Sequence, residues 1–262
     1  MDKKSAIGVF DSGVGGITVL KELIDLLPSE NIIYYGDSGN SPYGDKSQGE
    51  IQKLCINIVD FLIEKKCKMI VIACNTATKA AIDILREQYN LPVIGVIESG
   101  AKKALEVTKN NKVGILSTVF TAKTNAYLDE INKFASNVEV YQKGCKDLCP
   151  MIENGWETYE DRMTLLEEYI ADLPEEIDTI VLGCTHYPLI VDDISKLTHG
   201  KCIIDPAKET SVVAKKTLES LNMLNDSKED GKISFYVSGD VKKFGKIAEK
   251  VLLMKIDEIK SV

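Results

Sequence analysis

Hydrophobic residues in this chain fall into short β-branched runs separated by longer stretches with helical spacing. The runs predict strands at residues 7–10, 32–35, 69–73, 93–96, 113–116, 138–141, 179–182, 202–204 and 233–237. The stretches between them predict helices, for example at residues 17–27, 51–65, 80–88, 122–132 and 210–221. Strands that alternate with helices are typical of βαβ units, so we expect an α/β protein built on parallel sheets.

The chain also resembles itself at two pairs of segments. Residues 7–12 (IGVFDS) are echoed by residues 113–118 (VGILST), and residues 69–76 (MIVIACNT) by residues 179–186 (TIVLGCTH). The second pair is an apolar strand that ends in a small residue, a cysteine and short polar residues. We therefore expect a pseudo-duplication, in which each half presents one cysteine at the carboxyl end of a parallel strand.

A predicted helix start near residue 206 sets the boundary between the expected domains. Asp205 and Pro206 predict a helix start, with Asp as N-cap and Pro at the first helical position, and this helix returns the chain to the first domain. We expect one domain at 1–97 plus 207–262, and the other at 98–206. Ligands of open parallel sheets bind outside the carboxyl ends of the strands, so we expect the active site in the cleft between the domains.

Composition narrows the class of partner. With 262 residues and 44% hydrophobic residues, the chain can bury a substantial core, and its net charge of -8 gives it no means to grip nucleic acid or an anionic membrane. The apolar start is too short for a signal peptide, and no apolar run approaches the ~18 residues of a membrane span. Seven irregularly spaced cysteines favour free thiols in the reducing cytoplasm. We expect a cytoplasmic protein with a small-molecule ligand.

The cysteines divide into two groups by position. Cys55, Cys67 and Cys202 lie within or beside apolar elements, and we expect them to be buried packing residues. Cys74 and Cys184 each lie just beyond a strand and before a predicted helix, on turns that we expect to face the surface. The positive end of a helix dipole lowers the pKa of a thiol, which would make either cysteine a usable base.

Other polar segments qualify this interpretation. The turn at 11–16 (DSGVGG) is suited to a carboxylate or phosphate but is not the G-x-G-x-x-G dinucleotide motif. The loop at 36–44 offers Tyr43 and the Gly44 amide to a carboxylate. Cysteine and histidine spacing lacks the C-x2-C or H-x3-H knuckle, which disfavours zinc, and no lysine is marked for pyridoxal phosphate. We expect no metal and no cofactor.

Two thiols that face one another suit the inversion of an acidic carbon. One group removes a proton from one face while another delivers a proton to the opposite face, and groups of similar pKa make the reaction reversible. His186 lies two residues beyond Cys184 and titrates in a useful range.

Four segments resemble the signature segments of the glutamate racemase family: 10–16 (FDSGVGG), 42–44 (PYG), 73–78 (ACNTAT) and 183–188 (GCTHYP). The resemblance runs from about residue 6 to residue 209. It implies interconversion of L- and D-glutamate without cofactor, which supplies D-glutamate for bacterial peptidoglycan.

The same resemblance implies roles for individual residues. Cys74 would deprotonate D-glutamate with help from Asp11, and Cys184 would deprotonate L-glutamate with help from His186. The implied substrate-binding residues are Asp11, Ser12, Tyr43, Gly44, Asn75, Thr76, Thr118, Thr121, Thr185 and His186. Cys149 departs from the family pattern. Glu153 matches an acidic family position, but we expect it to be exposed and do not assign it to catalysis.

Three alternatives stay open. An aspartate racemase or a broader amino-acid racemase shares the paired cysteines, although aspartate racemases tend to carry Glu where this chain has His186. A binding or regulatory protein would take up a ligand without turnover. A thiol oxidoreductase is disfavoured by the lack of a C-x-x-C pair. The sequence leaves the oligomeric state open, with a homodimer among the alternatives.

Overall fold

The computed structural model describes residues 2–262 of the chain. The described chain divides into two compact units, one formed by residues 2–96 and Ala207–Val262 and the other by Ile97–Pro206. Within residues 2–262, no helix combines the length and apolar character needed to cross a membrane.

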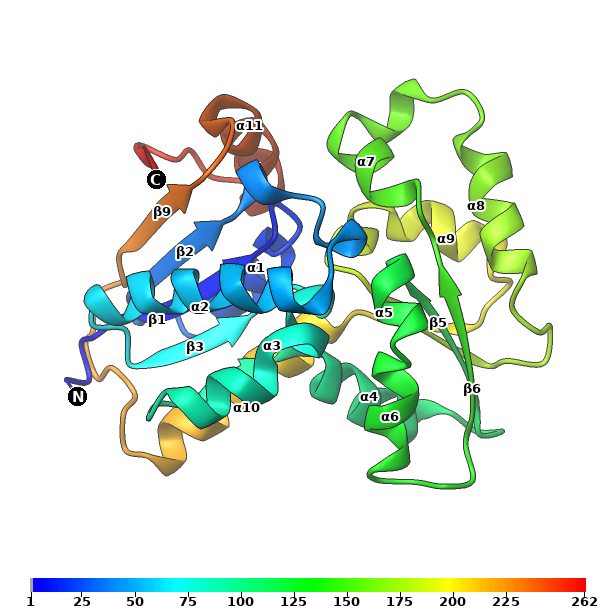
Figure 1. The fold of residues 1–262 in the computed structure, drawn as a ribbon, viewed down its shortest axis with the longest axis horizontal. Coiled ribbons are helices and arrows are strands. Elements are labelled where there is room, and N and C mark those ends of the chain that lie inside the picture. Colours follow the sequence, from blue (N-terminus) through cyan, green and yellow to red (C-terminus); the bar gives the residue numbers. More distant parts are fainter. Residues whose placement is uncertain (1) are drawn as a thin grey trace. The chain divides into compact units, whose positions relative to one another are not determined.

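The first unit is built on a six-stranded sheet in which all paired strands are parallel (Figure 1). Its strands, in spatial order, are β10 (Ile259–Ser261), β9 (Ile233–Val237), β2 (Ile32–Gly36), β1 (Ile7–Asp11), β3 (Met69–Ile72) and β4 (Val93–Gly95). The central strands β1 and β3 are buried along their whole length, as expected for a parallel sheet that is covered on both faces.

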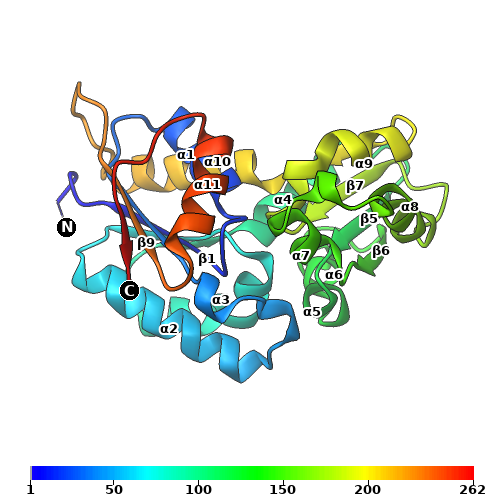
Figure 2. The ribbon, with the colours of Figure 1, turned by 90° about the horizontal axis from the view of Figure 1, so that it is seen from above.

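Helices cover both faces of this sheet (Figure 2). One face carries α1 (Ile17–Leu26), α10 (Pro206–Ser220) and α11 (Val241–Leu252), and the other carries α2 (Gln48–Glu64) and α3 (Asn75–Gln88). The start of α2 is fixed by a capping box, in which the Ser47 side chain accepts from the Glu50 amide and the Glu50 side chain accepts from the Ser47 amide.

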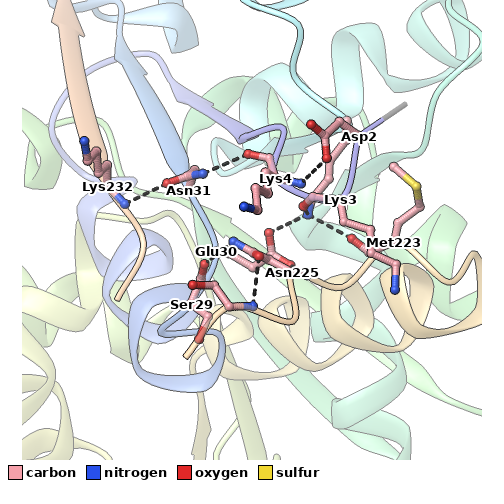
Figure 3. A network of polar contacts seen from close by, with 11 residues as sticks. Asp2, Lys3, Lys4, Ser29, Glu30, Asn31, Met223, Asn225 and Lys232 are labelled. Carbon is pink, nitrogen blue, oxygen red and sulfur yellow. Dashed lines mark hydrogen bonds and ion pairs between the residues drawn. The ribbon is translucent and has the colours of Figure 1, made fainter. Parts of the chain in front are cut away.

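Polar contacts join the N-terminal residues, the loop before β2 and the loop before β9 (Figure 3). The Asn31 side chain donates to the Lys4 carbonyl and accepts from the Lys232 amide, both at 2.8 Å. In the same unit, Lys68 Nζ lies 2.6 Å from Glu30 Oε2, with both side chains almost fully buried. These contacts hold the start of β9 beside the start of β2.

The second unit has a four-stranded parallel sheet. Its strands, in spatial order, are β6 (Glu139–Gly144), β5 (Lys112–Ser117), β7 (Thr179–Gly183) and β8 (Cys202–Ile204). One face packs against α4 (Val96–Val107), α5 (Val119–Lys123) and α6 (Ala126–Asn132), and the other against α7 (Leu148–Glu153), α8 (Arg162–Ala171) and α9 (Val191–Leu197).

The two sheets repeat one strand order. Counted along each unit, four strands lie in the order second, first, third, fourth, as β2-β1-β3-β4 and as β6-β5-β7-β8. The predicted α/β class with two parallel sheets is confirmed. In each unit a cysteine follows the third strand, Cys74 after β3 and Cys184 after β7.

Some local predictions were wrong. The helix predicted at 122–132 is two helices, because Asn125 adopts a left-handed φ of 51° between α5 and α6. The strand predicted at 93–96 ends at Gly95, and Val96 already begins α4. Cys55 and Cys67 are buried as predicted, whereas Cys202 is exposed because it begins the edge strand β8.

Candidate active site

The thiol of Cys74 lies between the ends of β1 and β3. Cys74 is the N-cap of α3, and its Sγ accepts the Ala77 amide hydrogen at 3.4 Å. The same thiol donates to Ser12 Oγ at 3.5 Å, so it touches the turn that follows β1. A thiolate here would face the positive end of a 14-residue helix. The sequence analysis predicted that Cys74 faces the surface. This prediction is wrong, because only 6% of Cys74 is exposed.

Asp11 ends strand β1 and is completely buried. Its Oδ1 accepts the Gly13 amide hydrogen at 2.8 Å, which folds the turn back on the strand end. Gly16 lies against this carboxylate residue so closely that an added Cβ would be 2.5 Å from Asp11 Cβ. Asn75 and Thr76 open α3 beside this turn and are buried too.

A second buried carboxylate, Asp37, organises the loop after β2. Its Oδ2 accepts from the Tyr43 hydroxyl at 2.6 Å, and its Oδ1 accepts from Asn40 Nδ2 at 3.0 Å and from Ser238 Oγ at 2.6 Å. Burial and the neighbouring Asp37 charge raise the pKa of Tyr43, so its hydroxyl stays protonated. Tyr43 and Gly44 belong to the short 3-10 helix η2 (Tyr43–Asp45), which Asp37 thereby holds in place.

The second thiol, Cys184, belongs to a chain of four side chains. Its Sγ lies 3.2 Å from Cys149 Sγ and 3.7 Å from His186 Nδ1. His186 Nε2 lies 2.8 Å from Glu153 Oε1. Cys184 and His186 are only 6% and 5% exposed, whereas Cys149 and Glu153, both on α7, are partly exposed.

The electrostatic setting of Cys184 differs from the prediction. No long helix begins at this thiol, because the 3-10 helix η4 (Tyr187–Ile190) has His186 as its N-cap. The hydrogen bond with Cys149 and burial raise the pKa of Cys184 well above its ordinary value, and the predicted lowering is wrong for this residue. Burial alone would lower the pKa of His186, but its contacts with Cys184 and Glu153 raise it well above the ordinary value.

Threonines line the ends of the strands beside Cys184. Thr118 follows β5 and is the N-cap of α5, where its Oγ1 accepts the Thr121 amide at 3.3 Å and donates to Thr121 Oγ1 at 3.0 Å. Thr185 is buried between Cys184 and His186. The fully buried Tyr187 hydroxyl donates to the carbonyl of Ser117, the last residue of β5, and to that of Cys145, which follows β6, so it connects the ends of these two strands to the turn after β7.

The structure thus groups the predicted residues by unit. The first unit brings together Asp11, Ser12, Asn75, Thr76 and Cys74, with Tyr43 and Gly44 on the neighbouring loop. The second unit brings together Thr118, Thr121, Cys184, Thr185 and His186. Sequence reasoning missed Asp37, although it lies in a segment already marked as a binding loop, and underrated Glu153, which contacts His186.

These features define a class of protein: an α/β fold of two parallel sheets, each with a buried thiol at the point where the order of its strands reverses. The chain matches the family described as Asp/Glu/Hydantoin racemase over residues 7–214. It therefore belongs to this racemase family, and the resemblance drawn from the four sequence segments is confirmed.

Known relatives match almost end to end. A glutamate racemase of Fusobacterium nucleatum is 48% identical over 257 residues, which covers 98% of this chain and 97% of the relative. The crystal structure of a glutamate racemase isoform from Bacillus anthracis has a TM-score of 0.94 at 38% identity, covering 99% of this chain and 97% of the other. The Francisella tularensis enzyme, solved in complex with D-glutamate, has a TM-score of 0.93 at 37% identity, covering 99% and 98%.

Proposed function

We propose that the protein is a glutamate racemase that interconverts L- and D-glutamate by proton transfer through Cys74 and Cys184, without cofactor. The observation that carries this proposal is the repeated placement of a buried thiol after the third strand of each sheet. Membership of the racemase family and the glutamate racemase relatives support the choice of reaction and substrate.

The reaction needs two monoprotic groups on opposite faces of the substrate Cα. A thiolate on one face takes the Cα proton and leaves a carbanion beside the carboxylate, and a thiol on the other face gives its proton to that carbon. Cys74 acts on the proton of D-glutamate, and Cys184 acts on the proton of L-glutamate.

Each thiol has a neighbour suited to handling its proton. Asp11 ends the strand beside Cys74, and His186 Nδ1 lies 3.7 Å from Cys184 Sγ. Glu153 orients the His186 ring through Nε2, as the third member of a nucleophile, base and orienting group does elsewhere. The raised pKa of Cys184 keeps it protonated in this arrangement, which is the state that completes L-glutamate from the carbanion.

Substrate binding in this proposal uses polar side chains and backbone amides from both units. We assign this role to the following residues: Asp11, Ser12, Tyr43, Gly44, Asn75, Thr76, Thr118, Thr121, Thr185 and His186. Several lie at helix starts, where backbone amides attract carboxylates. In the cell, the D-glutamate formed would enter peptidoglycan, and we retain the cytoplasmic location predicted from the cysteine pattern.

A chiral assay tests the reaction directly. Purified protein without added cofactor is incubated with L-glutamate, and the loss of optical activity is followed by circular dichroism. We expect complete racemisation of glutamate and much slower turnover of L-aspartate. Faster turnover of aspartate would point to an aspartate racemase, and ligand binding without turnover would point to a binding protein.

Cysteine variants test the assignment of the thiols. Cys74→Ala and Cys184→Ala are each expected to abolish racemisation while circular dichroism in the far ultraviolet stays unchanged. Cys55→Ala, a buried cysteine outside the group, serves as the matched control and should lose stability by about 1 kcal/mol but not activity. A Cys74 or Cys184 variant that keeps a tenth of the activity would exclude that thiol.

A further inference from the structure

Three soft metal ligands converge in the second unit from two separate segments. Cys149 comes from α7, and Cys184 and His186 come from the turn after β7. Cys149 Sγ, Cys184 Sγ and a ring nitrogen of His186 all lie within 4.8 Å of one another. This grouping could not be read from sequence spacing, because Cys149 is brought to the other two residues by the fold.

The separations suit a tetrahedral zinc ion. Zn–S bonds of about 2.3 Å and Zn–N bonds of about 2.0 to 2.1 Å place neighbouring tetrahedral ligands roughly 3.5 to 3.8 Å apart. The Sγ atoms of Cys149 and Cys184 are 3.2 Å apart, and Cys184 Sγ is 3.7 Å from His186 Nδ1. These two separations need adjustments of only a few tenths of an ångström, and the Cys149 sulfur and the His186 nitrogen, which lie within 4.8 Å of each other, move together by up to about 1 Å as the ion binds.

The far nitrogen of His186 provides a second, independent observation. His186 Nε2 lies 2.8 Å from Glu153 Oε1, so once the ring has lost its Nδ1 hydrogen to make way for a metal, the remaining hydrogen stays on Nε2 and the Nδ1 lone pair faces the Cys184 sulfur. Histidines that bind metal usually donate their other ring hydrogen to a carboxylate in this manner. The ring is thus already oriented as a ligand.

The chemistry of the ligands selects the ion. Two thiols and an imidazole favour zinc over the hard cations magnesium and calcium, which prefer oxygen ligands. Cys149 is partly exposed, which gives the ion a route to the two buried ligands. Three protein ligands leave a fourth position for water or a carboxylate.

We propose that Cys149, Cys184 and His186 bind one zinc ion, and that the bound ion stops racemisation by occupying the Cys184 sulfur. On binding, two S–H bonds break and two S–Zn bonds form, the protonated His186 ring loses its Nδ1 hydrogen as the Zn–N bond forms, and three protons pass to the solvent. Cys184 then has no proton to give and no free thiolate to accept one. Binding does not depend on the proposed function, whereas the inhibition rests on it.

Binding is measured on the whole protein, after reduction and removal of metal by a chelator. Zinc is titrated in competition with a chromophoric chelator, and Co²⁺ is titrated separately to detect thiolate-to-cobalt charge-transfer absorption. We expect one ion per chain in both titrations. Cys149→Ala and Cys149→Ser should lower the zinc affinity at least 10-fold, Glu153→Gln should weaken it about 10- to 100-fold, and Cys55→Ala should leave it unchanged.

The activity arm uses the same proteins. Zinc should inhibit glutamate racemisation by the unmodified chain, and chelator should restore it, while both Cys149 variants stay active at zinc concentrations that inhibit the unmodified chain. Affinity unchanged in both Cys149 variants, or no stoichiometric binding, would overturn the site. Inhibition reversed by a thiol reductant but not by chelator would indicate a Cys149–Cys184 disulfide and would also overturn it. Stoichiometric binding without any racemase activity would support the site and refute the proposed function.

Discussion

In each unit, one carboxylate organises the candidate site through hydrogen bonds to residues that are distant in the chain: the buried Asp37 in the first unit and the partly exposed Glu153 in the second. Asp37 joins the loop after β2 to Ser238, which follows β9. Glu153 joins the end of α7 to His186. Neither carboxylate needs to touch a substrate to matter, because each fixes the position of a side chain that we expect to do so.

Replacing Asp37 tests this positioning role. Asp37→Asn puts an amide group where three side-chain donors now find carboxylate oxygens, so at least one donor is left without an acceptor. We expect a loss of about 2 kcal/mol in the free energy of unfolding, measured by urea denaturation. The KM for glutamate should rise more than kcat falls, because η2 carries Tyr43 and Gly44.

Asn40→Ala is the matched control for this variant. It removes one of the three donors and leaves the carboxylate intact, so it should cost about 1 kcal/mol or less with little change in KM. Equal effects of the two substitutions on KM would contradict the role assigned to Asp37.

At the residue scale, the sequence indicates which residues are chemically reactive, but it does not indicate which distant residues they contact. Asp11 could be singled out because it ends a recognisable apolar strand, and Cys74 and Cys184 because each follows one closely. The contact of Cys149 with Cys184 spans 35 positions, and no local pattern encodes it. The same long range explains why the pKa of Cys184 was predicted in the wrong direction, since its largest cause is the Cys149 thiol.

The candidate site residues lie at junctions where a strand is followed by a turn and a helix. The turn from β1 to α1 leaves little room for a larger side chain. The turn from β1 to α1 passes so close to its own strand that a Cβ on Gly16 would lie 2.8 Å from the Tyr34 hydroxyl and 2.9 Å from Ala73 Cβ. These neighbours are buried parts of the core and cannot move aside freely.

Gly16→Ala should therefore destabilise the protein by about 1 to 3 kcal/mol and lower racemase activity, because Asp11 must shift. Gly49→Ala in α2 is the control, since nothing lies within 4 Å of its added Cβ and alanine favours a helix. Thermal unfolding should show a lower Tm for the first variant and an equal or higher Tm for the second. A stable and active Gly16→Ala variant would contradict the packing argument.

The turn from α4 to β5 gives a prediction on pH. Partial burial alone would raise the pKa of Asp178, but hydrogen bonds from the Lys109 amide, the Thr179 and Thr108 hydroxyls and the Asn110 amide lower it. A lowered folded-state pKa stabilises the fold above the unfolded pKa of about 3.9 and loses that contribution as the pH falls through the folded pKa.

Asp178→Asn should accordingly cost about 1 kcal/mol near neutral pH, a modest value because solvent screens this partly exposed group. The difference from the unmodified chain, measured by denaturation at a series of pH values, should shrink below about pH 4. A difference that stays constant across that range would show that the carboxylate charge is not the cause.

At the element scale, strongly periodic segments were predictable and weak ones were not. The strand predicted at 233–237 matches β9 in both bounds. The short strand β10 was missed, because its three residues are mostly exposed and carry no alternation. The break between α5 and α6 was missed because it depends on one Asn125 backbone conformation rather than on the hydrophobic pattern.

For the whole molecule, the repeated strand order is the feature with functional weight. The order reverses between the first and third strands in both sheets, and ligands of α/β sheets bind at such points. Each sheet therefore has a buried cysteine close to such a point, Cys74 in the first unit and Cys184 in the second, and the proposed mechanism assigns one proton transfer to each thiol.

Isotope labelling tests this division of labour. In heavy water, D-glutamate formed early from unlabelled L-glutamate should carry deuterium at Cα, because Cys184 removes hydrogen and Cys74 supplies deuterium from solvent. Remaining L-glutamate should stay mostly unlabelled, since burial of Cys184 slows exchange of the hydrogen it has just received. Both enantiomers are separated and analysed by mass spectrometry.

Two outcomes would contradict the assignment of one thiol to each face. Product that retains substrate hydrogen would indicate a single shared base. Deuterium in unreacted L-glutamate at early times would indicate that the proton on the starting face exchanges before the carbanion collapses.

The return of the chain to the first unit determines the order in which a nascent chain can complete its parts. The second unit is one continuous stretch, so its sheet can close while the ribosome is still adding later residues. The first sheet lacks β9 and β10 until the C-terminal region emerges, and the outer edge of β2 stays unpaired until then. The unit that contains the N-terminal strands is therefore the last to be completed, and an exposed edge of this kind is a point where newly made chains can aggregate.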